Sequence, residues 1–164
     1  PTNTKIPVIM IGVGAGLAPF VAFLNEGNHV LKKQNKTVND FGEWWLFFGC
    51  RYKNKDWIYE NEVNNSLIQN GGVLKELKLA FSRDQKQKIY VQHLIKKNSE
   101  KLFELISKEN ARIYVCGGVA MGKAVRNAFT EIFEFYKTQN NNITGPEYLD
   151  KLLKSDTYVQ ELWG

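Results

Sequence analysis

Four short runs of apolar residues recur along the chain, and each is followed by glycine or a small polar residue. They read IPVIMIG (residues 6–12), WWLFFGC (44–50), LKLAFS (77–82) and ARIYVCGG (111–118). Strands that helices cover on both faces are nearly continuous in apolar character, whereas strands with one wet face alternate. The runs therefore predict an α/β fold, a three-layer Rossmann-like parallel sheet with helices on both faces and right-handed crossovers.

Stretches with a helical spacing of apolar residues separate these runs. They cover residues 17–31, 58–68, 91–106 and 120–136. We expect a last helix after Thr144, because its hydroxyl and the carboxylate of Glu147 have the spacing of a capping box. The run YVQELW (158–163) reads as a closing strand, and the Asn- and Lys-rich residues 25–43 read as a long loop after a helix end.

The length of 164 residues, with 43% hydrophobic content, suits one domain with its own core, and we find no internal repeat or domain boundary. The chain begins at Pro1 without a methionine, so we interpret residues 1–164 as one domain cut from a longer protein. No apolar run approaches the roughly 20 residues of a membrane span, and no signal peptide is visible. We therefore expect no membrane contact from this segment.

The net charge of +5 comes from lysines that are scattered along the chain rather than clustered. This pattern argues against nucleic acid as a partner, whereas a small phosphate ester needs only two or three cations. Cys50 and Cys116 lie inside apolar runs, which predicts free thiols and a reducing, intracellular setting. Neither histidine has the spacing of a metal ligand, and three tryptophans read as packing residues (Trp44, Trp45, Trp57).

Three glycines at alternate positions follow the first apolar run, in the sequence GVGAG (12–16). Glycine allows a sharp turn and lets backbone N–H groups approach a phosphate, and the next helix adds its positive end. The spacing is G-x-G-x-G, not the G-x-G-x-x-G of the common dinucleotide fold. Alone, the turn is as consistent with a purely structural bend as with a phosphate site.

Polar side chains follow the third run, in the sequence SRDQKQKIYVQ (82–92). Its hydroxyl, guanidinium, ammonium and phenol groups can enclose a phosphate monoester and stack an adenine ring. No acidic residue stands about 20 positions after the glycines, where it would bind a free ribose 2′-hydroxyl. These residues favour NADP over NAD. Cys116, at the end of the fourth run, places a small thiol where a nicotinamide would lie.

Together the motifs resemble the C-terminal NADP-binding domain of the ferredoxin–NADP reductase superfamily. They look most like the diflavin reductases, the group of NADPH–cytochrome P450 reductase, methionine synthase reductase and the sulfite reductase flavoprotein. The matching pieces are PVIMIGVGAGLAPF, LFFGCR, FSRD with KIYVQ, IYVCGG and YVQELW, which fall in order from residue 7 to 163. The resemblance therefore covers essentially the whole chain.

The resemblance implies a role for each matched position. It implies an adenosine 2′-phosphate and adenine site made of five residues (Ser82, Arg83, Lys88, Tyr90, Gln92) and a pyrophosphate loop at Gly14, Ala15 and Gly16. Cys116 matches the cysteine beside the nicotinamide C4. Trp163 matches the near-terminal aromatic residue that covers the flavin and must move before hydride transfer. Glu161 matches an aspartate that steadies the charge developing on the nicotinamide.

The chain departs from the family pattern at four places. Val13 and Ala15 replace residues of G-P-G-T-G, so a threonine hydroxyl is missing. Gly118 stands where an aspartate is usual, and the loop that follows is one residue shorter, with Ala124 in place of an acidic residue. Glu161 is one methylene longer than aspartate. None of these changes touches the 2′-phosphate residues, so NADPH binding is better supported than efficient hydride transfer.

The resemblance implies an NADPH-binding domain that positions NADPH for hydride transfer to FAD, in a flavoprotein oxidoreductase with onward electron transfer. It also implies an upstream FAD-binding domain, an FMN domain, and a hemoprotein or other electron acceptor as partners. The whole protein would be cytoplasmic, or at the cytosolic face of the endoplasmic reticulum if it carries an anchor. The alternatives are an NADP-binding module that has lost hydride transfer, or a reductase that serves methionine synthase or sulfite reductase.

Overall fold

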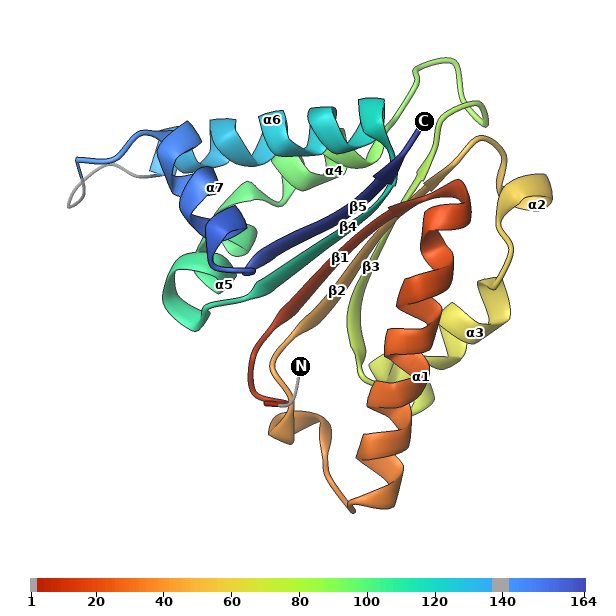
Figure 1. Cartoon of the computed structure of the whole chain (residues 1–164). Coiled ribbons are helices and arrows are strands. Elements are labelled where there is room, and N and C mark those ends of the chain that lie inside the picture. The colour runs from red at the N-terminus through yellow and green to blue at the C-terminus, as the bar shows by residue number, and fades with distance from the viewer. Residues whose placement is uncertain (1–2, 137–141) are drawn as a thin grey trace.

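The computed structural model describes residues 3–136 and 142–164, and its centre is a sheet of five strands (Figure 1). The strands are β1 (Val8–Val13), β2 (Trp44–Cys50), β3 (Leu74–Phe81), β4 (Arg112–Gly118) and β5 (Tyr158–Trp163). Their spatial order is β3-β2-β1-β4-β5, and every neighbouring pair is parallel. The order reverses between β1 and β4, which is where open α/β sheets bind ligands.

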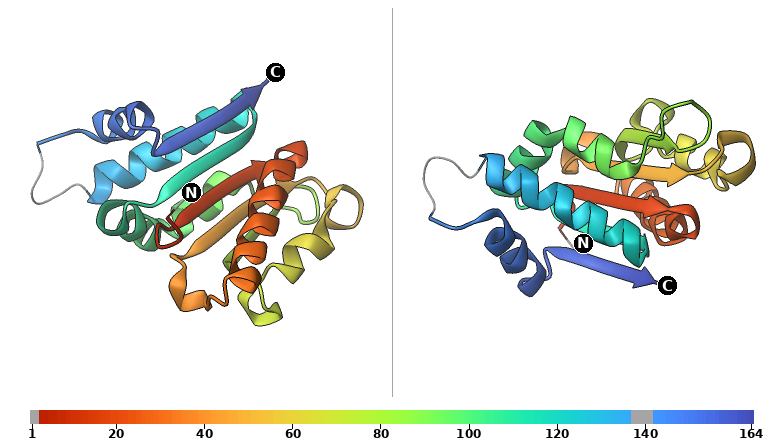
Figure 2. Two further views of the ribbon diagram at one scale, coloured as in Figure 1. Left: turned by 60° about the horizontal axis from the view of Figure 1, so that its bottom comes forward. Right: turned by 90° about the horizontal axis from the view of Figure 1, so that it is seen from above.

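Helices cover both faces of the sheet, so the three-layer Rossmann-like fold is confirmed (Figures 1 and 2). One face carries α1 (Ala18–Lys33) and α3 (Glu60–Asn65), and the other carries α4 (Val91–Lys97), α5 (Ser99–Glu109), α6 (Val119–Tyr136) and α7 (Gly145–Lys154). Shorter turns are α2 (Lys53–Asp56), η1 (Gly14–Leu17), η2 (Val38–Asp40) and η3 (Ile68–Asn70).

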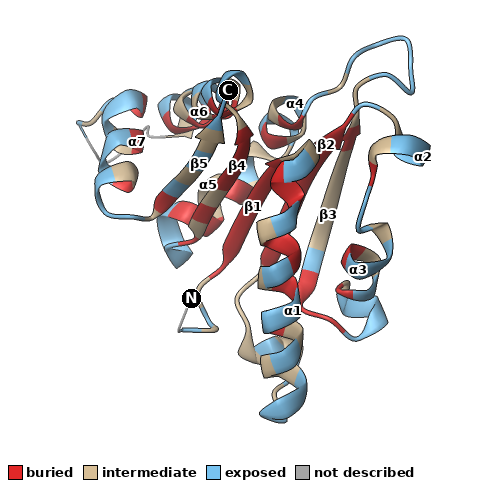
Figure 3. Cartoon of the chain, turned by 45° about the vertical axis from the view of Figure 1, so that its right-hand side comes forward, coloured by how far each residue is buried: buried red, intermediate tan, exposed pale blue. Residues whose placement is uncertain are grey.

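The strands alternate their side chains between two apolar clusters, which is why both faces read as hydrophobic. In β1, Val8 and Met10 pack with α1, whereas Ile9 and Ile11 pack with α4–α6. All four side chains are completely buried. Burial on both faces therefore explains the continuous apolar runs, and Figure 3 shows the buried colour along β1 and β4.

One predicted boundary, the start of the loop after the first helix, is wrong because local polarity concealed the helix. The sequence predicts a helical stretch over 17–31 and a loop over 25–43, which overlap, and the structure places residues 25–33 in the second half of α1. Asn25, Lys32 and Lys33 are exposed, while Gly27 is buried so tightly that a methyl group there would lie 2.9 Å from Trp44 and Val73 side-chain atoms. The loop therefore begins only at Gln34.

The helical stretch 58–68 is shorter than predicted, and the stretch 91–106 is divided in two and extends to Glu109. Tyr59 has a left-handed backbone (φ 64°), so the first helix begins only at Glu60. The second stretch divides into α4 and α5 at Asn98, whose side-chain amide donates to the Leu94 carbonyl over 2.8 Å. An Asn side chain that competes for backbone partners in this way favours a helix end.

The capping box before α7 is confirmed. The Thr144 N–H donates to the Glu147 carboxylate over 2.6 Å, and the Glu147 N–H donates to the Thr144 hydroxyl over 3.3 Å.

Strand β3 begins at Leu74, three residues before the predicted start, because the Leu74 N–H donates to the Ser66 carbonyl and pairing starts there.

Glu43 joins three elements at the amino end of the sheet. Its carboxylate accepts from Lys75 at 2.8 Å, from Lys101 at 3.1 Å and from the Trp45 indole at 2.9 Å. Burial raises the pKa of this carboxyl, but these three hydrogen bonds outweigh burial and hold the pKa below its usual range. The cluster ties the start of β2 to β3 and α5.

Candidate functional site

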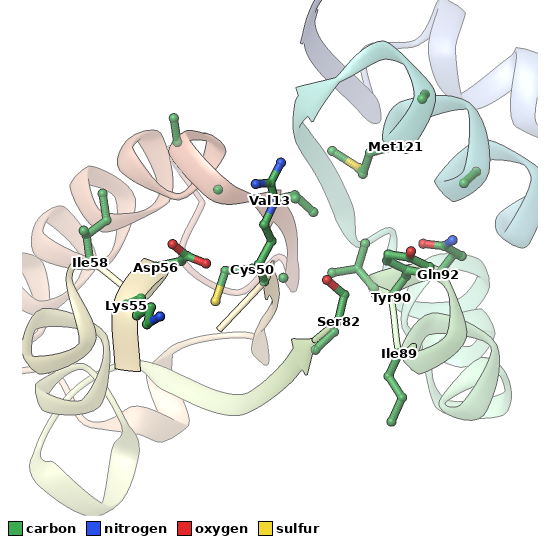
Figure 4. A pocket seen from close by; sticks show the side chains of 18 residues that line it. Val13, Cys50, Lys55, Asp56, Ile58, Ser82, Ile89, Tyr90, Gln92 and Met121 are labelled. Atoms are coloured by element: carbon green, nitrogen blue, oxygen red, sulfur yellow. The ribbon is translucent and has the colours of Figure 1, made fainter. Parts of the chain in front are cut away.

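A cavity of about 760 Å³ opens at the carboxyl ends of β1, β2 and β3 (Figure 4). Its volume lies within the range of about 300–1,000 Å³ that is usual for cofactor sites. Elements far apart in the sequence line it: the glycine turn after β1, the loop after β2, the loop after β3 and the first turns of α6. The site is therefore built where a parallel sheet is expected to bind its ligand.

The three glycines of the first turn have different physical roles. Gly14 has φ +58°, a conformation that favours glycine, and no atom lies within 4 Å of the position that its Cβ would occupy. Gly14 and Ala15 line the cavity. Gly16 is buried, and a Cβ there would lie 2.7 Å from the Cys116 carbonyl carbon. The turn is thus open toward the cavity at Gly14 and closely packed on β4 at Gly16.

The loop after β3 is bound to the end of β2. The Ser82 N–H donates to the Cys50 carbonyl over 3.0 Å, and the Arg83 N–H donates to the Arg51 carbonyl over 2.9 Å. Three of the residues predicted for the 2′-phosphate and adenine line the cavity (Ser82, Tyr90, Gln92). Arg83 and Lys88 lie on the same loop with exposed side chains, outside the cavity lining.

The cations beside this cavity are available to an anion. In residues 3–136 and 142–164, the side chains of Arg51, Arg83 and Lys88 form no hydrogen bond or ion pair, whereas Lys75 and Lys101 are bound to Glu43. Arg51 lines the cavity, and its guanidinium forms no salt bridge with any described residue. Unpaired guanidinium and ammonium groups at one edge of a cavity can bind a phosphate.

Tyr90 is positioned by a residue that sequence reasoning did not assign. Its N–H donates to the His93 Nδ1 over 3.0 Å, and the two ring centroids lie 5.7 Å apart. His93 thereby caps the amino end of α4 and holds Tyr90 at the cavity, with the Tyr90 side chain 41% exposed. His93 stands three residues after the N-cap residue Tyr90, where Glu or Gln is usual. A histidine at this position gives no capping signal in the sequence.

The remaining predicted residues form a second group, on β4 and β5. Cys116 is opposite Glu161 in the parallel pairing of these strands, and Gly118 is opposite Trp163. Cys116 is buried and packs in the cluster on the α1 face, whereas Trp163 is 47% exposed. Burial raises the pKa of the Cys116 thiol, and the nearby Glu161 carboxylate raises it further. The structure therefore brings Cys116 and Glu161 together, but none of the three lines the cavity.

The departures from the family pattern make one wall of the cavity apolar. Ala15 and Ala124 line it, together with Ala120 and Met121 from the first turns of α6. Gly117 has φ +157°, and a Cβ there would clash with the Met121 methyl group. Met121 therefore packs directly on the end of β4. These side chains offer van der Waals contact and no hydrogen bond to a ligand at this end.

The three tryptophans that the sequence assigned to packing are buried. Trp44, Trp45 and Trp57 are each at most 9% exposed, so they are core residues. Cys50 and Cys116 are free thiols. Within the described parts of the chain, no helix is long and apolar enough to cross a bilayer. Over the same residues, no three His, Cys, Asp or Glu side chains are grouped as a metal site would require.

Comparison with known proteins agrees with the geometry. The model of the oxidoreductase NAD-binding domain matches residues 10–127. The chain is 39% identical over 168 residues to the NADPH–cytochrome P450 reductase of Salmo trutta, and 39% identical over 165 residues to that of Rattus norvegicus. The reductase of Musca domestica is 38% identical over 164 residues.

These alignments cover 99% of this chain but only 23–26% of the relatives. The chain thus spans about a quarter of the length of the curated relatives that it matches. The resemblance to the diflavin reductases that the motifs indicated is confirmed.

Proposed function

Because the chain belongs to the family of oxidoreductase NAD-binding domains, we propose that it is the NADPH-binding domain of a flavoprotein reductase resembling NADPH–cytochrome P450 reductase. One observation carries this proposal: a loop with unpaired cations at Arg83 and Lys88 borders a cavity whose other edge is the open glycine turn. A 2′-phosphate and a pyrophosphate are the two anionic groups of NADPH, and each finds a matching surface.

The residues after β3 hold the phosphate end of the coenzyme. Arg83 donates forked hydrogen bonds to the 2′-phosphate, Lys88 adds a point charge, and the Ser82 hydroxyl donates a third contact. Tyr90 offers its ring to the adenine, and the Gln92 amide lies beside it in the cavity lining.

The turn after β1 receives the pyrophosphate. Gly14 and Ala15 line the cavity, and their backbone N–H groups bind the pyrophosphate in this proposal, while Gly16 packs the turn against β4. The positive end of the following helix favours the negative charge placed there.

Residues of β4 and β5 serve the transfer end. Cys116 orients the nicotinamide, Glu161 places a negative charge where the oxidised ring is positive, and Trp163 covers the flavin until the nicotinamide replaces it. Bound NADPH supplies the hydride with which an FAD is reduced. Close and aligned approach contributes much of the rate of such a transfer, so these residues act chiefly by position.

The whole protein is proposed to contain more than this domain, since the relatives are about four times as long. Residues 1–164 would be its NADP-binding domain, with an FAD-binding domain upstream and an FMN domain that passes electrons to a hemoprotein or another acceptor. We place it in the cytoplasm, or at the cytosolic face of the endoplasmic reticulum if an anchor is present. The isolated domain should bind NADP(H) and turn over little.

A second candidate is a nucleotide-binding module that has lost hydride transfer. The absence of a hydroxyl at Ala15 and of carboxylates at Gly118 and Ala124 favours it. A full-length protein that binds NADPH without reducing its own flavin would establish this candidate. Reductases of methionine synthase or sulfite reductase remain alternatives for the acceptor, and reduction assays with each acceptor distinguish them.

Binding of adenosine 2′,5′-bisphosphate, measured by isothermal titration calorimetry, tests the proposed coenzyme site. We expect salt-sensitive binding that Arg83→Ala weakens by about 1.5–3 kcal/mol, the usual contribution of a hydrogen bond to a charged group. Lys32→Ala is the matched control, because Lys32 is an exposed cation in the last turn of α1. Equal binding by the Arg83 variant and the wild type, or equal competition by NADH and NADPH, would contradict the proposal.

A further inference from the structure

Asp56 is the only acidic residue among the described residues that line the coenzyme cavity. Two cations, Arg51 and Lys55, line the cavity as well, and in Figure 4 the Asp56 carboxylate points into it. A carboxylate in an anion-binding cavity needs an explanation, because it repels any phosphate placed beside it. A ligand group that donates a hydrogen bond to this carboxylate would supply one.

The Asp56 carboxylate is held at the end of β2. One of its oxygens, Oδ2, accepts the N–H of Tyr52, the residue before α2, over 3.0 Å. Burial raises the pKa of the Cys50 thiol, at the last residue of β2, and the nearby Asp56 carboxylate raises it further. The Asp56 side chain is half-buried, and the structure shows no second hydrogen bond to it within the described residues. Its other oxygen is therefore free to accept one.

The sheet order determines which part of the coenzyme meets this oxygen. In the proposed function the pyrophosphate turn follows β1 and the 2′-phosphate loop follows β3, and β2 lies between these strands. The loop after β2 is joined to the loop after β3 by the Ser82–Cys50 and Arg83–Arg51 backbone hydrogen bonds. One ribose carries both anionic groups, the pyrophosphate on C5′ and the phosphate on C2′. This sugar must therefore cross the end of β2, where Asp56 stands.

Three side chains across the cavity follow the order of the substituents on this ribose. In Figure 4, Ser82 lies between Asp56 and Tyr90. On the sugar, C2′ with its phosphate lies between C1′, which carries the adenine, and C3′, which carries a hydroxyl. With the phosphate at Ser82 and the adenine at Tyr90, the 3′-hydroxyl lies on the side of the sugar away from the base. That side faces Asp56.

We infer that Asp56 accepts a hydrogen bond from the 3′-hydroxyl of the adenosine ribose and so selects a coenzyme with a free hydroxyl at this carbon. This inference rests on the proposed function. The 3′-hydroxyl is the one hydroxyl that this ribose keeps when C2′ is phosphorylated, and an ionised carboxylate can only accept. A site built to bind a hydroxyl rejects an analogue that lacks it, because the polar group of the site is then left unpaired.

The test compares adenosine 2′,5′-bisphosphate with its 3′-deoxy analogue by calorimetry, on the 164-residue chain. The wild type should bind the compound with the 3′-hydroxyl about tenfold to a hundredfold more tightly. Asp56→Ala removes both oxygens, so it should bind the two compounds equally. Asp56→Asn keeps an oxygen for the Tyr52 N–H and offers the ligand only a neutral amide, so its preference should fall to a few-fold. This variant decides the question even if Asp56→Ala does not fold.

Asp84→Asn is the matched control. Asp84 also accepts a backbone N–H of the same loop, that of Lys53 over 2.9 Å, but it does not line the cavity. This variant should keep the wild-type preference. Equal binding of the two compounds by the wild type, or an undiminished preference in Asp56→Asn, would overturn the inference while leaving the coenzyme site in place. Binding of neither compound would overturn the coenzyme site and the inference with it.

Discussion

Replacing Gly16 by alanine should destabilise the protein far more than its surroundings in the sequence suggest. The new Cβ would lie 2.7 Å from the carbonyl carbon of Cys116 and closer still to its oxygen. Two carbon atoms pack at about 3.5–4.0 Å, so the contact is roughly an ångström too short. Both atoms in conflict are backbone, and the turn after β1 must therefore move away from β4.

The cost follows from the kind of clash. Overpacking a core costs about 1–3 kcal/mol, and a clash that only backbone movement relieves belongs at or above the upper end. For a domain of this size, about 3 kcal/mol lowers the midpoint of thermal unfolding by roughly 6–12 °C. We expect Gly16→Ala to show this loss in urea denaturation, followed by far-UV circular dichroism.

Gly14→Ala separates the clash from the loss of a glycine. At Gly14 no atom lies within 4 Å of the added Cβ, so only the left-handed φ of +58° opposes the change. That strain costs about 1–2 kcal/mol. The close packing of the turn on β4 is refuted if the free energy of unfolding of Gly16→Ala lies within about 1 kcal/mol of the wild-type value. It is also refuted if Gly16→Ala is no less stable than Gly14→Ala.

Two further predictions follow from the pKa shifts. The Glu43 carboxyl has a pKa below its ordinary value of 4.5, because three hydrogen bonds outweigh the opposing effect of burial. Its stabilisation is present above pH 4.5 and is lost as the pH falls through the folded-state pKa, so denaturation curves should show a smaller acid dependence for Glu43→Gln. Glu161→Gln removes one cause of the raised Cys116 pKa, so iodoacetamide should alkylate this thiol faster at neutral pH. Mass spectrometry follows both thiols, and Cys50 is the internal control, because burial and then the Asp56 and Asp84 carboxylates raise its pKa to about 11. An unchanged alkylation rate at Cys116 would contradict the effect of Glu161 on this thiol.

The strands were predicted from the sequence because burial on both faces leaves a strong signal. The run 44–50 coincides with β2, in which all seven residues are buried. Strand β3 lies at the edge of the sheet and carries Lys75, Glu76 and Lys78 near its start. Its first three residues were therefore missed, because charged side chains on an edge strand resemble a loop.

The candidate site was predicted less completely, since spacing along a chain does not show what lies side by side in space. Motif resemblance indicated Ser82, Tyr90 and Gln92, which do line the cavity. The place of Asp56 in the cavity lining carried no signal in the sequence, because a single carboxylate after a strand does not show which side chains it will face. The packing of Gly16 on β4 likewise depends on two strands that are about 100 residues apart in the sequence.

In the proposed function, the spatial order of the strands separates the residues that bind the coenzyme from those that serve hydride transfer. Read across the sheet from β3 to β5, the predicted residues run from the 2′-phosphate, through the pyrophosphate turn after β1, to Cys116 and Trp163. The departures from the family pattern lie at the ends of β1 and β4, in α6 and in β5, and none follows β3, so most of them fall toward the transfer end. The proposed contacts to the 2′-phosphate use charges that these departures do not change. Loss of a hydroxyl at Ala15 or a carboxylate at Gly118 should therefore change the alignment of the nicotinamide while NADP(H) binding persists.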